Sequence, residues 1–443
     1  MTQTVTILPQ YTCQSDFPID FSISQEKVNA TTTENSSNKD QKLTASLENS
    51  KPPSFWISKY KENETPTHGK VQVIFNKGNE VPTLNAEPEF NVHWLNSNAF
   101  ELTDNDNTII MKSYDKNYKI QNKNINSIDI SPLESLMVTG EDDAVIKLIE
   151  IDTGNIRRIF EGHYGDITKV RFFPSGQVLL TAGTDLQIKI WSVLDGSCPV
   201  TLKGHTRAIT DTAIISRGRN VLSSSKDGSV RLWECGSSST IRKICQLDKP
   251  IHKIALGEIN KEYLTKNKNN SSLSSSSSEV TLDPREVETR GKVLFVLTDH
   301  TFYGYDLGQP NQDPIFVGHQ GIDHSPFSAI AYDQENNKLY TGNEEGIIAI
   351  WDLNQLSQPI QLLKRNNTTI TSLHVLPNHG ILVTQGDGQL YLCQMEENNE
   401  HPYCLIKKEF VGSDLEPWYD ACITSSGTII AGGRNGLLQK YTL

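Results

Sequence analysis

The chain has 443 residues, of which 36% are hydrophobic and 21% charged, and 53 acidic against 41 basic residues give a net charge of −12. This composition suits a globular protein, lacks the basic footprint of a nucleic-acid-binding protein, and favours basic partners. No apolar run approaches the roughly 20 residues of a membrane span, and the first residues lack the pattern of a secretory signal. Seven scattered cysteines without a CxxC pair predict reduced thiols. We therefore expect a cytoplasmic and nuclear protein without nucleic-acid or membrane partners.

The first part of the chain, residues 1–107, is predicted to form a small lobe. Residues 23–50 are a polar tract rich in Ser, Thr and Asn, and such a tract cannot bury a core. We expect it to be disordered. On its C-terminal side, the short apolar runs 55–57 and 71–75 are typical of strands.

Beyond this lobe, one unit recurs along the chain: an apolar strand, a tight polar turn and a second alternating strand. The units cover 136–151, 178–193, 221–235, 294–307, 339–353, 382–395 and 429–443. Their turns are centred on Asp143, Asp185, Asp227, Asp299, Glu345, Asp387 and Asn435, so successive gaps are 42, 42, 72, 46, 42 and 48 residues. All gaps but one fit the period of about 40–45 residues of a four-stranded propeller blade. The sequence therefore predicts an all-β protein with a seven-bladed β-propeller.

Two segments need separate explanations. The 72-residue gap contains a Ser- and Asn-rich stretch, which we interpret as a disordered insertion at about 265–291, in the loop that joins the first two strands of blade four. The last blade has only three predicted strands, near 418–424, 428–432 and 436–442, which would leave an unpaired edge. We expect residues 108–120 to be its outer strand, so that the propeller covers 108–443.

Polar residues recur at fixed offsets in two of the units. One set is His163, Thr181, Asp185 and Trp191, and the other is His205, Ser223, Asp227 and Trp233. In both, Asp follows His by 22 residues and Trp follows Asp by 6. A third, partial set comprises His319, Thr341, Glu345 and Trp351.

These residue types permit two interpretations. Ser, His and Asp are the components of a hydrolase triad, with His163 or His205 as the base. Repetition around the ring and the added Trp instead favour hydrogen-bonded structural tetrads, and we adopt this interpretation. The sequence contains no phosphate-binding GxxxxGK[ST] loop and no HExxH motif. We expect no catalytic residues, no cofactor and no metal.

The charges at the turns and blade connections are unevenly distributed. Topology places an acidic arc on one face, from blade seven through blades one and two. We expect it to bind a partner, with Trp418 as an apolar anchor. The alternative is a solvated rim with Trp418 in the strand core. The expected partner-binding residues are Glu141, Asp142, Glu161, Asp166, Asp414, Glu416 and Trp418.

Longer motifs resemble one family. Residues 161–192 and 201–236, the segment 284–288, the turn 385–388 and the terminal 434–437 are similar to the proteasomal ATPase-associated factor family, a group of WD-repeat proteins. The resemblance extends over roughly 125–443. Gly-His and Trp-Asp pairs occur in very many propellers, whereas 171–176 together with 211–214 and 217–220 are more discriminating.

The resemblance implies a non-enzymatic chaperone for assembly of the proteasome regulatory particle. Such a protein binds the C-terminal domain of one proteasomal AAA ATPase subunit and thereby times the association of the particle with the core particle. Other assembly chaperones of the regulatory particle are further expected partners, and we expect a monomer. The alternative is a generic WD-repeat scaffold or substrate receptor in another complex, such as a ubiquitin ligase or a ribosome-assembly complex.

Overall fold

The computed structural model describes most of the chain as β-strands. The described residues are 5–14, 17, 54–74, 81–87, 90–104, 107–118, 120, 123–258, 282–310, 313–320, 325–376, 380–396 and 403–443. The predicted disorder of 23–50, and that of 265–281 in the Ser-rich insertion, lies outside these residues. Apart from strands, two 3-10 turns occupy tight positions between strands, η1 (Asp142–Ala144) and η2 (Arg434–Gly436).

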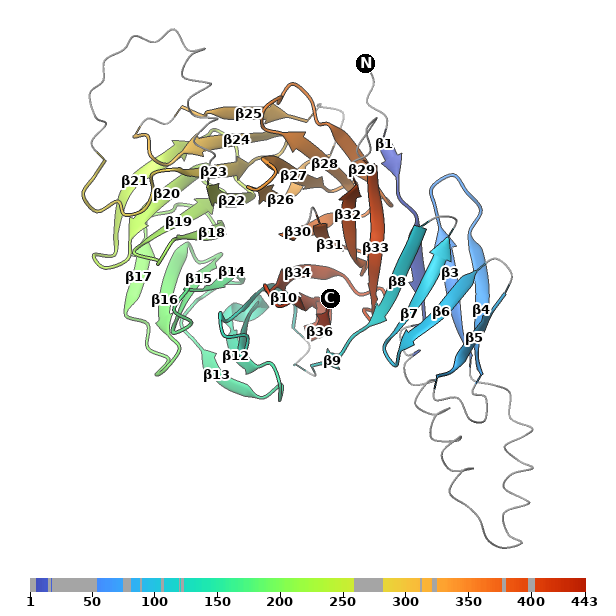
Figure 1. Ribbon diagram of the computed structural model, residues 1–443. Coiled ribbons are helices and arrows are strands. Elements are labelled where there is room, and N and C mark those ends of the chain that lie inside the picture. Colours follow the sequence, from blue (N-terminus) through green and yellow to red (C-terminus); the bar gives the residue numbers. More distant parts are fainter. Residues whose placement is uncertain are drawn as a thin grey trace, which may run out of the picture.

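Within the described residues, seven sheets repeat one arrangement, in which consecutive strands pair antiparallel, and the sheets are set in a ring (Figure 1). The first three sheets are β10 (Ile125–Ile130), β11 (Leu136–Glu141), β12 (Ile146–Glu150) and β13 (Ile156–Phe160); β14 (Ile167–Phe172), β15 (Val178–Gly183), β16 (Gln187–Ser192) and β17 (Val200–Lys203); and β18 (Ile209–Ile215), β19 (Asn220–Ser225), β20 (Ser229–Glu234) and β21 (Ser239–Gln246).

The next three sheets follow the same order. They are β22 (Lys253–Glu258), β23 (Lys292–Leu297), β24 (Thr301–Asp306) and β25 (Phe316–His319); β26 (Phe327–Asp333), β27 (Lys338–Asn343), β28 (Ile347–Asp352) and β29 (Gln361–Lys364); and β30 (Ile370–Leu376), β31 (Gly380–Gln385), β32 (Leu390–Glu396) and β33 (Tyr403–Val411).

The last sheet takes its outer strand from an earlier part of the chain. It consists of β34 (Trp418–Ile423), β35 (Thr428–Gly433), β36 (Leu438–Thr442) and β9 (Lys116–Asn117), and β9 pairs antiparallel with β36 through Lys116 and Lys440. The chain therefore contains a nearly all-β WD-repeat propeller, and the propeller sheets among the described residues are as many as the polar turns counted in the sequence.

Two aspartates on the first strands, the buried Asp420 and the half-buried Asp129, join neighbouring sheets at the centre. An oxygen of Asp420 in β34 accepts a hydrogen bond from the backbone N–H of Ile128 in β10, at 3.3 Å. Asp129 in β10 likewise accepts from Phe172 N in β14 at 2.6 Å. Each bond satisfies a backbone donor that an inner strand would otherwise leave unpaired, and a buried unpaired donor costs about 1–3 kcal/mol.

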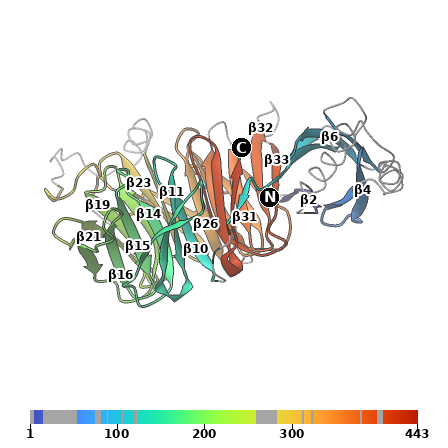
Figure 2. The ribbon, with the colours of Figure 1, turned by 90° about the horizontal axis from the view of Figure 1, so that it is seen from below.

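The strands that precede the propeller form a lobe against its side (Figure 2). A separate sheet contains β2 (Gln10–Cys13), β3 (Ser54–Tyr60), β4 (Thr67–Ile74) and β5 (Thr83–Ala86). The next strands, β6 (Asn91–Asn96), β7 (Ala99–Asp104) and β8 (Asn107–Ser113), extend the sheet of blade six, because β8 pairs parallel with β33. In addition, β1 (Val5–Ile7) pairs parallel with β29. The lobe and these two blades share one hydrophobic core, in which the rings of Phe17, Phe55 and Phe100 are in contact.

Two sequence-based boundaries differ from the structure. Residues 108–120 are not one outer strand of the last sheet: β8 pairs with β33 of blade six, and only Lys116–Asn117 pairs with β36. The predicted disordered insertion also extends too far, because 282–291 are ordered against blades three and four. There Arg242 forms an ion pair with the buried Glu286 at 2.9 Å, and Asn220 Oδ1 accepts from Val287 N at 2.7 Å.

Candidate functional site

The two full sets of polar residues form hydrogen-bonded chains inside their blades. In blade two, His163 Nδ1 lies 2.8 Å from Asp185 Oδ2, His163 Nε2 lies 2.8 Å from Thr181 Oγ1, and Trp191 Nε1 donates to the same hydroxyl at 2.8 Å. Blade three repeats this geometry. His205 contacts Asp227 at 2.9 Å and Ser223 at 2.7 Å, and Trp233 donates to Ser223 at 2.8 Å.

The electrostatics of these tetrads fix the direction of the bonds. Burial alone would raise the pKa of Asp227, but hydrogen bonds from Ser229, the backbone N–H of Thr206 and His205 outweigh it and lower this pKa. The carboxylate is thus an acceptor, so Nδ1 of His205 donates to it. Burial lowers the pKa of His205, which keeps Nε2 unprotonated and able to accept the hydroxyl proton of Ser223.

This geometry holds strands together and leaves no nucleophile exposed. Ser223 and Thr181 are fully buried, and the oxygen of each is occupied by a Trp donor as well as by the imidazole. A hydrolase nucleophile has to reach a substrate, whereas these hydroxyls face the interior of a blade.

The third, partial set is brought together only in part. Trp351 Nε1 donates to Thr341 Oγ1 at 2.9 Å, as in the other two blades. His319 instead belongs to β25 of the preceding sheet, where its Nδ1 lies 3.0 Å from Thr301 Oγ1. Glu345 is exposed, and its turn is held by Asn343 Oδ1, which accepts from the N–H groups of Glu345 and Ile347.

On one face of the propeller, the loop before each first strand packs beside the turn between the second and third strands. Hydrogen bonds connect these loops across three blades. Asn435 in η2 donates through Nδ2 to Glu416 at 3.3 Å and through its backbone N–H to Asn124 at 3.2 Å. Asn124 in turn donates to Asp142 at 2.7 Å. The adjoining Asp143 donates its backbone N–H to Asp166 at 3.3 Å.

We call this surface the acidic rim. It comprises Asp142, Glu161, Asp166, Asp414 and Glu416, together with the exposed apolar side chains of Tyr164 and Leu415. Glu161, Asp166 and Asp414 are exposed, and Asp142 and Glu416 are half-buried. Two cations lie nearby: Lys123, which is paired with Asp143 at 2.9 Å, and the exposed Arg434. The surface is therefore predominantly negative.

The exposed apolar side chains of the rim are not the one expected from the sequence. Trp418 is fully buried in β34, where its Nε1 donates to Gly388 O at 3.0 Å, so the alternative of a strand-core Trp holds. Tyr164 is instead 86% exposed and Leu415 is 73% exposed, on the loops that carry the rim acids. One feature of the sequence could have indicated Tyr164: it lies between His163 and Asp166, in a loop that the predicted topology places on this face.

Glu141 also lies outside the rim. It is buried and pairs with the buried Lys147 at 2.7 Å. Burial raises the pKa of Glu141, whereas Lys147 opposes that shift. The pair is internal to blade one, so the expectation that Glu141 contacts a partner is wrong. An inward-facing position of a second strand can hold an acid when a Lys on the neighbouring strand pairs with it.

Among the residues that the structure describes, no group of three or more His, Cys, Asp or Glu is placed to hold a metal ion. In the same part of the chain, no helix has the length and apolarity that crossing a membrane requires. All seven cysteines are free thiols.

Comparison with known proteins places the chain in a family. The family model described as WD domain, G-beta repeat matches residues 154–192 and 196–234, which cover the two full tetrads. The chain is 34% identical over 392 residues to "Proteasomal ATPase-associated factor 1" of Homo sapiens, covering 88% of this chain and 94% of the human protein. It is 39% identical over 344 residues to the protein of that name from Gallus gallus, covering 77% and 81%. It is also 39% identical over 317 residues to "Probable proteasomal ATPase-associated factor 1" of Dictyostelium discoideum, covering 68% and 73%. The chain belongs to the proteasomal ATPase-associated factor 1 family, a family of non-catalytic WD-repeat proteins.

Proposed function

We propose that the chain is an assembly chaperone of the proteasome regulatory particle, which binds the C-terminal domain of a proteasomal AAA ATPase subunit through the acidic rim. The names of its relatives state an association with a proteasomal ATPase, and alignment with the human protein extends over 94% of that relative. Bound in this way, the factor would cover part of the subunit and delay its docking on the core particle. This activity belongs in the cytoplasm and nucleus, and the seven free cysteines suit a reducing compartment.

The observation that carries this proposal is the composition of the acidic rim. The loops of three adjacent blades that carry these acids also carry two exposed apolar side chains, Tyr164 and Leu415. Aromatic and large apolar side chains supply much of the energy of a protein interface, whereas peripheral charges mainly raise the association rate and select the partner. A basic domain with an apolar pocket is therefore the partner that this surface fits.

Affinity purification from cells tests the proposal. We expect the tagged full chain to retain proteasomal ATPases without mature core particle. A Tyr164→Ser variant should retain at least about tenfold less ATPase, the loss that truncation of an interface anchor typically causes. Leu133→Ser is the matched control, because Leu133 is also 86% exposed but lies in the β10–β11 connection, at the opposite end of the first strand.

Two outcomes would contradict the proposal. One is equal retention of ATPase by the Tyr164→Ser and Leu133→Ser variants, which would exclude the rim as the binding surface. The other is recovery of ubiquitin-ligase or ribosome-assembly proteins in place of ATPases, which would favour a scaffold of another complex. Purification of the variants at equal yield and equal thermal midpoint excludes misfolding as the cause of any loss.

A further inference from the structure

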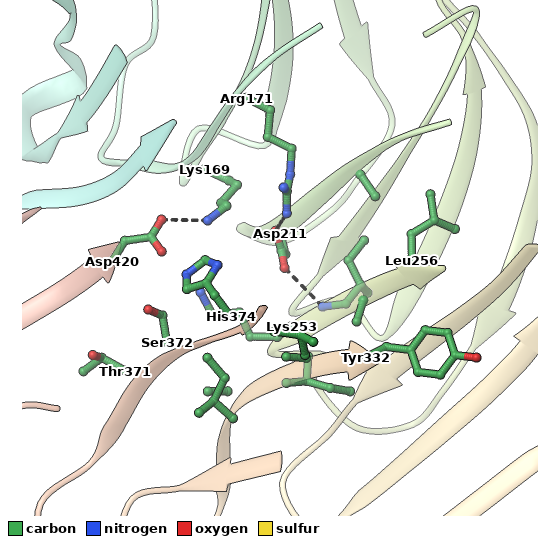
Figure 3. Close-up of a pocket in the computed structure, with 18 of the residues that line it drawn as sticks. Lys169, Arg171, Asp211, Lys253, Leu256, Tyr332, Thr371, Ser372, His374 and Asp420 are labelled. Carbon is green, nitrogen blue, oxygen red and sulfur yellow. Dashed lines mark hydrogen bonds and ion pairs between the residues drawn. The ribbon is translucent and has the colours of Figure 1, made fainter. Parts of the chain in front are cut away.

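A cavity of about 430 Å³ lies on the axis of the propeller, and none of the acidic-rim residues lines it. Its walls come from the first strands of blades two to seven, β14, β18, β22, β26, β30 and β34. We call it the axial cavity. Figure 3 shows that charged side chains from several of these strands converge on it. A volume of this size accommodates a small molecule.

The axial cavity contains more cationic than anionic groups. Lys169 Nζ lies 2.7 Å from Asp420 Oδ2, and Arg171 Nη2 lies 3.4 Å from Asp211 Oδ1. Lys253, from β22, is a third cation in the lining, and no described residue forms a hydrogen bond or ion pair with its Nζ. Burial lowers the pKa of Lys253, and the positive charge of Lys169 lowers it further. An ammonium in this position is stabilised by an added anion.

His374 adds a donor or acceptor that the protein leaves unused. Its Nε2 is buried and has no hydrogen-bond partner among the described residues. The ring is near Asp420 and Lys169 in the same lining (Figure 3). Burial lowers the pKa of His374 to about 4, so the ring is neutral at pH 7 and carries one N–H. A neutral imidazole whose Nε2 carries that proton can donate to a ligand oxygen.

The two carboxylates of the axial cavity are already engaged by the protein. Asp420 accepts hydrogen bonds from Ser127 Oγ at 3.0 Å and from the backbone N–H of Ile128 at 3.3 Å, in addition to its contact with Lys169. Asp211 accepts from Ile254 N at 3.2 Å. The cations keep spare donors, because an ammonium has three N–H groups and Lys169 uses one. Most of the hydrogen-bonding groups that remain unused in the axial cavity are therefore donors.

We propose that the axial cavity binds a small phosphate monoester, with the phosphate between Lys253, Lys169 and His374. A phosphate offers several acceptor oxygens in different directions, which matches donors that come from the separate strands β22, β14 and β30. The negative charge of the phosphate would also offset the excess positive charge of the lining, which contains three cations and two carboxylates. The cavity is larger than a phosphate ion, and the half-buried lining residues Ile214, Leu256 and Ile330 provide an apolar wall for an organic group. This proposal does not depend on the proposed function of the rim.

Calorimetric titration of the full chain in a buffer without phosphate tests the proposal. The probes are inorganic phosphate and glycerol 3-phosphate. We expect both to bind and the ester to bind more tightly, because only the ester contacts the apolar wall. Lys253→Met should weaken binding at least about tenfold, and His374→Gln should weaken it by a smaller factor. Lys203→Met is the matched control, because Lys203 is exposed on β17, outside the cavity, and it should bind as the wild type does.

Three results would overturn the proposal. The first is that neither probe binds at about 10 mM, and the second is that Lys253→Met binds the probes as tightly as the wild type does. The third is that the control Lys203→Met loses as much affinity for the probes as Lys253→Met does. If inorganic phosphate bound more tightly than the ester, the cavity would have no place for an organic group, and the proposal that its ligand is a phosphate monoester would be wrong. Thermal melting of each variant excludes unfolding, and the His374→Gln titration keeps the test decisive should Lys253→Met melt early.

Discussion

At the scale of single residues, the repeated polar positions are structural. The sequence offsets predicted both full tetrads, because the same spacing in two repeats places the same four side chains together. The third set could not be predicted in full, since His319 is the last residue of an outer strand and pairs with Thr301 there. Trp351 and Thr341 keep their bond without it. The Trp–hydroxyl bond is thus the part that all three blades share.

Removal of one tetrad hydroxyl should therefore reduce stability. Ser223→Ala leaves the buried Trp233 N–H without an acceptor and His205 Nε2 without a donor. We expect the free energy of unfolding in urea to fall by about 2–3 kcal/mol, the cost of lost bonds and an unpaired buried group. Ser237→Ala is the control, because Ser237 is exposed, and its effect should stay within about 0.5 kcal/mol. A stable Ser223→Ala protein would contradict the structural role.

Stability should also depend on pH through His374. Burial lowers its pKa to about 4; Lys169, Arg171 and Lys253 contribute to that shift, and Asp420 opposes it. Between pH 6.5 and 4 the unfolded chain thus binds a proton that the folded protein does not, so stability falls as the pH falls through this range. In His374→Gln we expect the slope of unfolding free energy against pH to decrease by up to about 1.4 kcal/mol per pH unit. His93→Gln, at an exposed site, serves as the control, and an unchanged slope in His374→Gln would contradict the buried neutral imidazole.

The errors at single positions share a physical origin. Strand and turn patterns showed on which face Glu141 and Trp418 lie, but not whether a neighbour covers them. Glu141 is covered because Lys147 of the next strand forms an ion pair with it, and Trp418 because the turn at Gly388 accepts its N–H. Both partners belong to other strands or blades, so the local pattern could not reveal them.

At the scale of elements, the strands of the propeller were well predicted from the repeat, whereas the junction with the lobe was not. The expected strands of the last blade, near 418–424, 428–432 and 436–442, differ from β34, β35 and β36 by two residues at most at each end. Residues 108–120 carry an apolar pattern that suits one strand. The structure divides them because Ile109 and Met111 enter the core shared with blade six, whereas Tyr118 packs against blade one. Only tertiary contacts decide that division.

Deletion of residues 1–122 should disrupt the propeller. It removes β9 and β8, exposing β36 and β33 as open edges, and it removes the half of a shared core that Phe55 and Phe100 provide. Exposed edges and apolar surface favour aggregation. We expect insoluble protein on expression, measured by the soluble fraction after centrifugation. Deletion of 23–50 removes no described strand and should leave soluble protein. A soluble, cooperatively melting 1–122 deletion would contradict the closure by the N-terminal segment.

At the scale of the whole molecule, the two faces of the propeller differ in what they offer a partner. The face with the blade connections carries the acidic rim and its exposed apolar side chains. Family resemblance and charge led from the sequence to the type of partner that we propose. The residues proposed to contact it required the structure, because exposure of Tyr164 and Leu415 follows from how three blades bring their loops together.

A rim variant has to preserve the fold to be informative. Glu161 is exposed and tolerates reversal to Lys. Asp414 has φ of 51°, a conformation that Asn adopts more readily than Lys, so Asp414→Asn is the suitable neutralisation. Reversal of Glu141 would place a second ammonium beside the buried Lys147 and destabilise blade one. Glu335→Lys, on the exposed β26–β27 connection of the opposite face, is the matched control.

The most direct test is the association rate of the purified full chain with the isolated C-terminal domains of the proteasomal ATPases, measured against salt concentration. We predict that at least one domain binds, that its association rate falls as salt screens the rim, and that Glu161→Lys with Asp414→Asn lowers the low-salt rate about tenfold while Glu335→Lys does not. Absence of binding to every domain at low salt, or equal rates for the rim variant and the wild type, would contradict the account.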